Sequence, residues 1–349
     1  MKAWAVVAPS APLEEIELPT PEPQGTEVLI EVTHCGVCHS DLHFWKGEYN
    51  MGGGKIMKIA DRGVTLPRAP GHEIAGRVTA VGSDAIGVKV GDIRVVYPWI
   101  GCGHCAACAE EQDNMCLQQR SLGVVQHGGF ASHVLVPHAR YLVDPGLVDV
   151  AVAATYACSG ITAYSAIRKA GPFIADQAIA VIGAGGVGLT TIAMLRALGQ
   201  NSIIAIDVSA ASRAAALEAG ATAAFDSGAT DVVAEVLASC GPAQAVFDHV
   251  GISPTATLGM NLLAKGGRLV VVGVSGGDLA LSLATMVFRA YSVIGTNTGT
   301  PQDLRDVMAM ANDGKMISPP VCCRSKSEAN QALLDLKLGD VTGRQVLTG

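Results

Sequence analysis

Residues 102–116, CGHCAACAEEQDNMC, carry cysteines in the spacing C-x2-C-x2-C-x7-C. Thiolates at this spacing can fill the tetrahedral coordination of a zinc ion and leave no position open for water. A redox pair would not need all of them, whereas an iron–sulfur cluster is a real alternative because closely spaced cysteines also hold clusters. We interpret the loop as a structural zinc site with the ligands Cys102, Cys105, Cys108 and Cys116.

A second group of possible metal ligands is scattered over the segments CGVCHSDLH (35–43), GHE (71–73) and CSG (158–160). A catalytic zinc ion takes three protein ligands and keeps one position open, and two thiolates with one imidazole suit a Lewis acid that binds an alcohol or carbonyl oxygen. We therefore predict a catalytic zinc site at Cys38, His72 and Cys158. Glu73 follows directly as a supporting or exchanging carboxylate.

The sequence GAGGVG, residues 183–188, fits the G-x-G-x-x-G pattern of dinucleotide-binding turns. It follows an apolar run expected to be a strand and opens a segment expected to be a helix, and the next apolar run ends at Asp207. Glycines let the backbone approach a pyrophosphate at a helix N-terminus, and an acid at this distance can accept hydrogen bonds from ribose hydroxyls. The alternative is a tight turn without a ligand. The predicted contacts are Gly183, Gly185, Gly186, Val187, Gly188 and Asp207.

The cofactor that this pattern favours is NAD. The carboxylate of Asp207 would repel the 2′-phosphate of NADP. NADP stays an alternative, because Arg213 is close enough in sequence to Asp207 to meet such a phosphate.

These residues need two kinds of scaffold. Residues 1 to about 150 alternate valines with polar residues between Gly and Pro turns, as is typical of a mostly β domain. From about residue 155, short apolar runs alternate with alanine-rich stretches, which indicates βαβ units around a parallel sheet buried on both faces. The last fifty residues hold two amphipathic stretches and no further βαβ repeat. We expect them to return to the first domain and to leave a cleft between the two.

The composition of the chain favours a small-molecule ligand over a nucleic acid or a membrane. The chain has 349 residues and a net charge of −7 with acids and bases interspersed, which argues against a nucleic-acid or anionic-membrane surface. Residues 178–195 lack charge over the length of a short membrane span, but their glycines favour a strand, a turn and a helix instead. The N-terminus does not read as a secretory signal, so we expect a cytoplasmic protein with reduced cysteines and a small-molecule partner.

These motifs, together with TGRQVL (342–347), resemble those of zinc-dependent medium-chain alcohol dehydrogenases over essentially the full length of the chain. The resemblance implies an α/β chain with a GroES-like, mostly β catalytic domain (1–153 and 298–349) split around a doubly wound Rossmann domain (154–297). It implies two zinc ions per chain, one on each ligand group. It also implies a proton relay through Ser40 and His43, a pyrophosphate contact from Arg344, and a homo-oligomer, a tetramer before a dimer.

The predicted reaction is reversible hydride transfer between a primary or secondary alcohol and NAD, giving an aldehyde or ketone. A polyol or amino-alcohol dehydrogenase on the same scaffold is one alternative, and a non-catalytic protein that binds zinc and a dinucleotide is another. Trp45, Tyr97 and Trp99 are candidates for the substrate wall because each lies within a few residues of a zinc motif. Ordinary core packing accounts for them equally well.

The stretch between the first catalytic ligand and His72 departs from the family pattern, since residues 49–73 are longer than in the short yeast-like members. The glycine triplet and lysines of this stretch indicate a mobile surface loop. Its position beside a zinc ligand could place it over the substrate mouth, and a tolerated surface insertion is the alternative.

Overall fold

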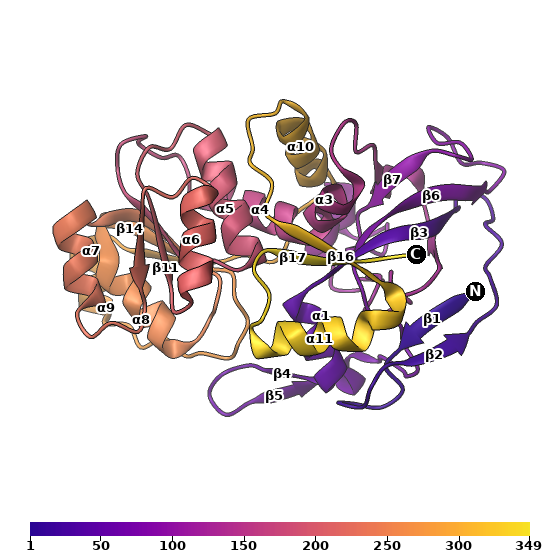
Figure 1. Cartoon of the computed structure of the whole chain (residues 1–349), viewed down its shortest axis with the longest axis horizontal. Helices are drawn as coiled ribbons and strands as arrows, with labels where there is room; N and C mark the ends of the chain where they lie inside the picture. The colour runs from indigo at the N-terminus through magenta and orange to yellow at the C-terminus, as the bar shows by residue number, and fades with distance from the viewer.

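The two strand patterns of the sequence form two separate large sheets, one in each half of the molecule (Figure 1). The computed structural model describes residues 1–349. The first sheet has seven strands in the order β16-β17-β3-β6-β7-β9, with β8 beside β3. Its strands are β3 (Val28–Val37), β6 (Glu73–Val81), β7 (Ile93–Val96), β8 (His133–Val136), β9 (Leu142–Val143), β16 (Val321–Ser325) and β17 (Arg344–Thr348). The strands β1 (Lys2–Ala5) and β2 (Glu14–Glu17) form a separate pair.

The C-terminal strands complete this first sheet. Strand β17 pairs antiparallel with β3, placing Val346 opposite Gly36, and β16 pairs parallel with β17. The two amphipathic stretches form α10 (Pro301–Asn312) and α11 (Ala329–Leu338). Arg344, the first residue of β17, is therefore brought beside the residues of the N-terminal domain. The domain bounds given above remain predictions.

The second sheet is parallel throughout, with the strand order β12-β11-β10-β13-β14-β15. Its strands are β10 (Ile179–Ile182), β11 (Ile203–Asp207), β12 (Ala223–Asp226), β13 (Ala243–Asp248), β14 (Leu263–Val271) and β15 (Ser292–Gly295). The intervening helices include α5 (Gly186–Ala197), α6 (Ala210–Glu218), α7 (Val232–Cys240) and α8 (Ser253–Leu262). The strand order reverses between β10 and β13, the point at which such sheets bind ligands at the carboxyl ends of their strands. The predicted Rossmann fold is confirmed.

One continuous helical segment, residues 150–170, joins the two halves. It consists of α3 (Val150–Thr155), a π-helical turn η4 (Tyr156–Gly160) and α4 (Ile161–Ala170). It is long and apolar enough to cross a membrane, but 83% of an 18-residue apolar stretch within it is buried inside the chain, as in a core helix. The uncharged run 178–195, which the sequence raised as a possible span, forms β10 and most of α5 instead. The π turn carries Cys158, and such turns are frequent at functional sites.

Candidate catalytic and dinucleotide sites

The three predicted catalytic ligands meet in space. Cys38 is the N-cap of α1 (His39–Lys46), His72 directly precedes β6, and Cys158 lies in the π turn η4. Their ligand atoms all lie within 4.8 Å of one another, and all three residues are buried. Both ring nitrogens of His72 are buried without a hydrogen-bond partner. Two thiols and a free imidazole nitrogen at this separation fit a zinc ion with an open position.

The electrostatics of this group favour a thiolate. The pKa of Cys38 is held well below its usual value by the neighbouring Cys158 thiol and by His72. Burial opposes this shift. A thiolate is the form of cysteine that binds a metal.

Asp41 supports two of these ligands and was not predicted from the sequence. Its buried carboxylate accepts hydrogen bonds from the backbone N–H of Cys38 and of Gly71, both at 2.9 Å. Nδ1 of His72 lies 3.2 Å from Oδ1 of the same carboxylate. Asp41 thus ties the two ligand-bearing segments together and orients the imidazole, as carboxylates beside metal-binding histidines do. Its position three residues after the N-cap Cys38 is a helix-capping signal that could have indicated it.

Glu73 and Arg344 connect the ligand group to the glycine turn. They form a buried ion pair between β6 and β17. A Cβ atom on Gly186 would contact the Arg344 side chain, so the arginine also lies against the first turn of α5. Burial raises the pKa of Glu73, and the guanidinium of Arg344 opposes this shift. The pair is placed to link the metal ligands to the expected pyrophosphate position.

The loop of closely spaced cysteines also closes around one point. The ligand atoms of Cys102, Cys105, Cys108 and Cys116 lie within 4.8 Å of one another. Sγ of Cys105 is 3.5 Å from Sγ of Cys108 and 3.8 Å from Sγ of Cys116. Sulfurs about 3.8 Å apart are what tetrahedral zinc with Zn–S bonds of about 2.3 Å requires. The arrangement fits a single ion and leaves no room for a cluster of several irons.

The glycine turn lies between β10 and α5, at the reversal point of the sheet. A Cβ atom on Gly188 would collide with the carbonyl oxygen of Gly183, so the turn can close only with glycine there. Asp207, at the end of β11, accepts hydrogen bonds from the N–H of Ala184 at 2.7 Å and of Ser209 at 2.8 Å. These bonds fix the carboxylate at the edge of the turn, the position that the sequence analysis expected for it.

The guanidinium of Arg213 already has partners within the protein. Its guanidinium lies 3.2 Å from the carboxylate of Asp226 and donates to the backbone oxygen of Asp207 at 2.8 Å. It therefore stands next to the acid of the turn, paired with a carboxylate. This pairing weakens its case as a partner for a 2′-phosphate.

His249 is a second residue that the sequence analysis missed. It follows β13, is half-buried, and its Nε2 lies 3.1 Å from Oγ1 of Thr191 in α5. Burial lowers the pKa of His249 to about 3, so the imidazole is neutral near pH 7. The ring of His249 packs against the glycine turn, since a Cβ atom on Gly188 would lie 3.6 Å from this ring. His249 follows a buried strand and belongs to no metal-binding or nucleophile motif, so the sequence gave no distinct signal for it.

The predicted relay residues lie on one helix. Ser40 and His43 are three positions apart on α1, a spacing that puts both on one face. The half-buried ring of His43 stacks on Tyr49 with 5.0 Å between ring centroids. Burial, and then Lys46, lower the pKa of His43 below its usual value.

Of the three aromatic candidates, the structure brings Trp99 to the ligand group. Its ring lies 5.2 Å from that of His72, and its indole nitrogen is buried without a hydrogen-bond partner. Trp45 instead donates to the backbone oxygen of Ala11 at 2.6 Å. Tyr97 is fully buried and donates to the backbone oxygen of Gly299 at 2.8 Å. Core packing, the alternative left open by the sequence, describes Trp45 and Tyr97.

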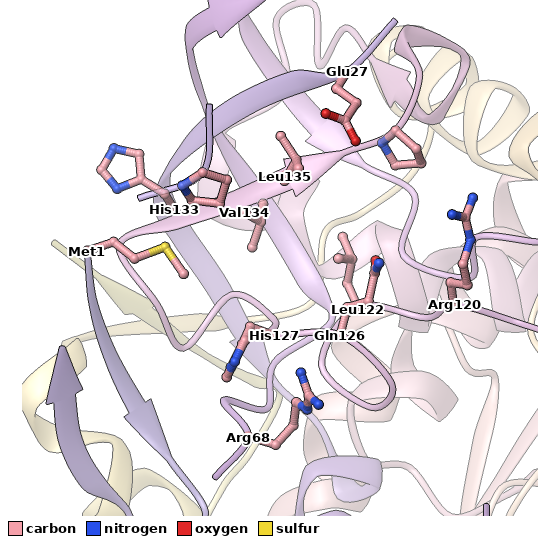
Figure 2. A pocket seen from close by; sticks show the side chains of 12 residues that line it. Met1, Glu27, Arg68, Arg120, Leu122, Gln126, His127, His133, Val134 and Leu135 are labelled. Atoms are coloured by element: carbon pink, nitrogen blue, oxygen red, sulfur yellow. The ribbon is translucent and has the colours of Figure 1, made fainter. Parts of the chain in front are cut away.

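A cavity of about 270 Å³ lies elsewhere on the catalytic domain (Figure 2). Arg68, Arg120 and His127 line it together with residues of β8. It contains none of the predicted metal, relay or dinucleotide residues. The grouping of those residues rests on their direct contacts.

Comparison with known proteins gives a consistent assignment. The family described as "Alcohol dehydrogenase GroES-like domain" matches residues 24–146, and "Zinc-binding dehydrogenase" matches residues 186–313. An NAD-dependent alcohol dehydrogenase of Sulfurisphaera tokodaii is 36% identical over 99% of both chains. A D-arabinose 1-dehydrogenase (NADP(+)) of Saccharolobus solfataricus is 36% identical over 97% of this chain and 95% of the relative.

The solved structures agree. The alcohol dehydrogenase of Aeropyrum pernix superimposes with a TM-score of 0.91 at 28% identity, covering 100% of both chains. The D-arabinose dehydrogenase of Sulfolobus solfataricus has a TM-score of 0.84 at 32% identity, covering 100% of this chain and 99% of the other. With both family matches and full-length relatives above 30% identity, the chain belongs to the zinc-dependent medium-chain dehydrogenase/reductase family.

Proposed function

We propose that this chain is an NAD-dependent zinc alcohol dehydrogenase that reversibly oxidises a primary or secondary alcohol at the group formed by Cys38, His72 and Cys158. The observation that carries this proposal is the convergence of their ligand atoms within 4.8 Å, with an unpartnered imidazole nitrogen. The Glu73–Arg344 pair joins this group to the glycine turn. NADH absorbance measured with primary, secondary, aromatic and polyol substrates on zinc-replete protein tests the proposal. No turnover with any class would contradict it.

The two metal groups would have different duties. Cys38, His72 and Cys158 would hold a zinc ion with one open position, whereas the four-cysteine loop would hold a second ion in a closed site. When bound, the first ion supplies Lewis acidity that lowers the pKa of an alcohol hydroxyl, and the dinucleotide supplies the hydride chemistry. Asp41 keeps His72 in the required orientation. Trp99 lies against His72 and offers a wall for the carbon chain of the substrate.

The proton of the alcohol must leave the buried group formed by Cys38, His72 and Cys158. Ser40 lies two residues after Cys38. Its hydroxyl can accept this proton only if it donates its own proton to another group at the same time. His43, one helical turn further, can hold it. Because the pKa of His43 is lowered, its neutral, proton-accepting form persists to lower pH than that of a free imidazole.

Replacing Ser40 by alanine is expected to lower kcat for alcohol oxidation by about 10²-fold, which is within the range expected when general acid–base catalysis is lost. His43→Gln should have a smaller effect, because water can substitute at the cleft mouth, and it should change the pH profile of kcat. Both variants should keep the wild-type zinc content. Wild-type rates and an unaltered pH profile in both would remove the relay from this mechanism.

Asp207 is expected to set the preference for NAD. Each oxygen of the Asp207 carboxylate accepts one backbone hydrogen bond and still has a free lone pair that can accept from a ribose hydroxyl. The negative charge of Asp207 repels an added 2′-phosphate. Asp207→Gly should reduce the ratio of kcat/KM for NAD over NADP by about tenfold or more. The ratio is measured with both cofactors on one substrate. A wild-type protein that already uses NADP better would show that Asp207 has been misassigned.

Polyol or sugar oxidation is the second candidate function. It is favoured by the similarity to a relative named D-arabinose 1-dehydrogenase (NADP(+)) and to the solved D-arabinose dehydrogenase. The substrate screen above separates it from oxidation of simple alcohols. A non-catalytic role is disfavoured, because a purely structural protein needs no ligand group with an open position.

Self-association is supported by one exposed face of the Rossmann domain. Strand β15 is the outer strand of its sheet, and α9 (Leu283–Arg289) beside it has no buried residue. Leu283 and Val287 are 77% exposed and Phe288 is 78% exposed. An unpaired edge next to an exposed apolar helix is a surface on which a second copy can pair. A homo-oligomer, with a tetramer before a dimer, is the proposed assembly.

A cytoplasmic location is also proposed. Six of the ten cysteines belong to the two metal groups, and all ten are free thiols. Cys322 and Cys323 are exposed on β16. Exposed free thiols and metal-binding thiolates suit a reducing compartment.

A further inference from the structure

The long stretch after the first ligand folds into a hairpin. Strands β4 (Glu48–Asn50) and β5 (Ile56–Lys58) pair antiparallel, with Tyr49 opposite Met57. Figure 1 shows the hairpin below α1, with its turn directed toward the domain of β10 to β15. The sequence left open whether this stretch lies over the substrate mouth or is a tolerated surface insertion.

The turn of the hairpin contacts the other domain. The N–H of Gly53 donates a hydrogen bond of 2.8 Å to Oδ2 of Asp278. A Cβ atom on Gly52 would lie 2.6 Å from Oδ1 of the same carboxylate, and one on Gly276 would collide with the Asn50 side chain. Glycines on both sides therefore permit a close approach between segments 225 residues apart.

On the Rossmann side, this contact continues to the dinucleotide turn. The N–H of Asp278 donates to Oγ of Ser253 at 2.8 Å, and the N–H of Gly277 donates to the backbone oxygen of Gly251 at 3.0 Å. The neighbouring Val250 packs against the turn, since a Cβ atom on Gly183 would lie 2.8 Å from it. A chain of direct contacts thus runs from the hairpin to the first glycine of the turn.

On the catalytic side, the hairpin contacts His43 of the proposed relay. Tyr49 of β4 stacks on His43 with its ring inclined by 27°. Burial raises the pKa of Tyr49 to about 12, so the phenol stays protonated and presents an uncharged ring to the imidazole. The same hairpin therefore touches His43 at its base and Asp278 at its tip.

We propose that the β4–β5 hairpin is a strap, fastened at Asp278, that couples the dinucleotide turn to the proposed relay and holds Tyr49 against His43. Gly53 and Asp278 are positioning residues, because they act through the hairpin. The inference rests on the dinucleotide site proposed above. If the fastened strap raises the affinity for the dinucleotide, then by linkage the bound dinucleotide must stabilise the fastened strap by the same factor.

Hydrogen exchange of the backbone amides of residues 48–58, with and without saturating NADH, tests this coupling on zinc-replete full-length protein. In the wild type, NADH is expected to slow the exchange of these amides. In Asp278→Ala this slowing should be lost, and the Kd for NADH, followed by its fluorescence, should rise about three- to tenfold, the range of one hydrogen bond. Asp278→Asn keeps an oxygen that can accept from Gly53 and should retain most of the wild-type behaviour.

The matched control is Asp231→Ala. Asp231 is an exposed carboxylate at the start of α7 in the same domain, with no capping hydrogen bond from its side chain. This variant should bind NADH as the wild type does. Exchange of residues 48–58 that ignores NADH, or an Asp278→Ala variant with wild-type affinity, would overturn the strap while leaving the dinucleotide site intact. A wild-type protein that binds no NADH would overturn the dinucleotide site and the strap with it.

Discussion

Replacing Cys38 with alanine is expected to abolish alcohol oxidation while leaving the chain folded. The change removes one of only three protein ligands of the proposed catalytic ion, whose Lewis acidity is worth several kcal/mol, so kcat should fall by at least about 10³-fold. The fold should survive because the bond that holds the start of α1 runs from the backbone N–H of Cys38 to Asp41 and does not use the thiol. The readouts are NADH formation, zinc per chain and the thermal midpoint.

Cys35→Ala is the matched control for this experiment. Cys35 is also buried and lies on β3, only three residues away, but it belongs to neither metal group. Its variant should keep both its zinc and its turnover. Full activity in Cys38→Ala, or equal inactivity of the two variants, would contradict the assignment of Cys38 as a ligand.

Replacing Cys105 with serine is expected to cost stability rather than chemistry. A closed thiolate site contributes folding free energy, and the loss of one ligand should lower the thermal midpoint by at least about 5 °C. The loop around the site is tied to the rest of the chain, since Nδ2 of Asn114 donates to the backbone oxygen of Asn297 at 2.8 Å. Loosening the loop therefore weakens the junction of the two domains.

Calorimetry and zinc analysis check this prediction, with Cys322→Ser as the control. Cys322 is exposed on β16 and lies outside both metal groups. The Cys105 variant should lose one zinc ion and keep most of its kcat per folded molecule. An unchanged midpoint combined with a collapse of kcat would reverse the duties given to the two groups.

The sequence was most informative where the required chemistry is local. The four-cysteine loop spans fifteen residues, and the glycine turn lies between an apolar run and a helix, so both could be identified without knowing the fold. The scattered ligands Cys38, His72 and Cys158 were found through residue type and ligand chemistry. The structure places all three together.

The contacts that the sequence could not predict depend on the direction in which a side chain points. Trp45 and Trp99 both lie near zinc motifs, yet one donates to Ala11 and the other packs on His72. Packing between distant segments decides such directions, and sequence distance does not. The same holds for Asp278, whose role emerges only when the domains are placed side by side. Asp41 is different, because its capping position was visible and its contact with His72 was not.

The measurement that tests the central assignment most directly is the metal content of the purified wild-type chain. Two thiolate-containing groups, one closed and one with an open position, are proposed to bind zinc independently. Elemental analysis should give two equivalents of zinc per chain and no iron. One equivalent of zinc, or iron with the visible absorption of an iron–sulfur cluster, would contradict the account.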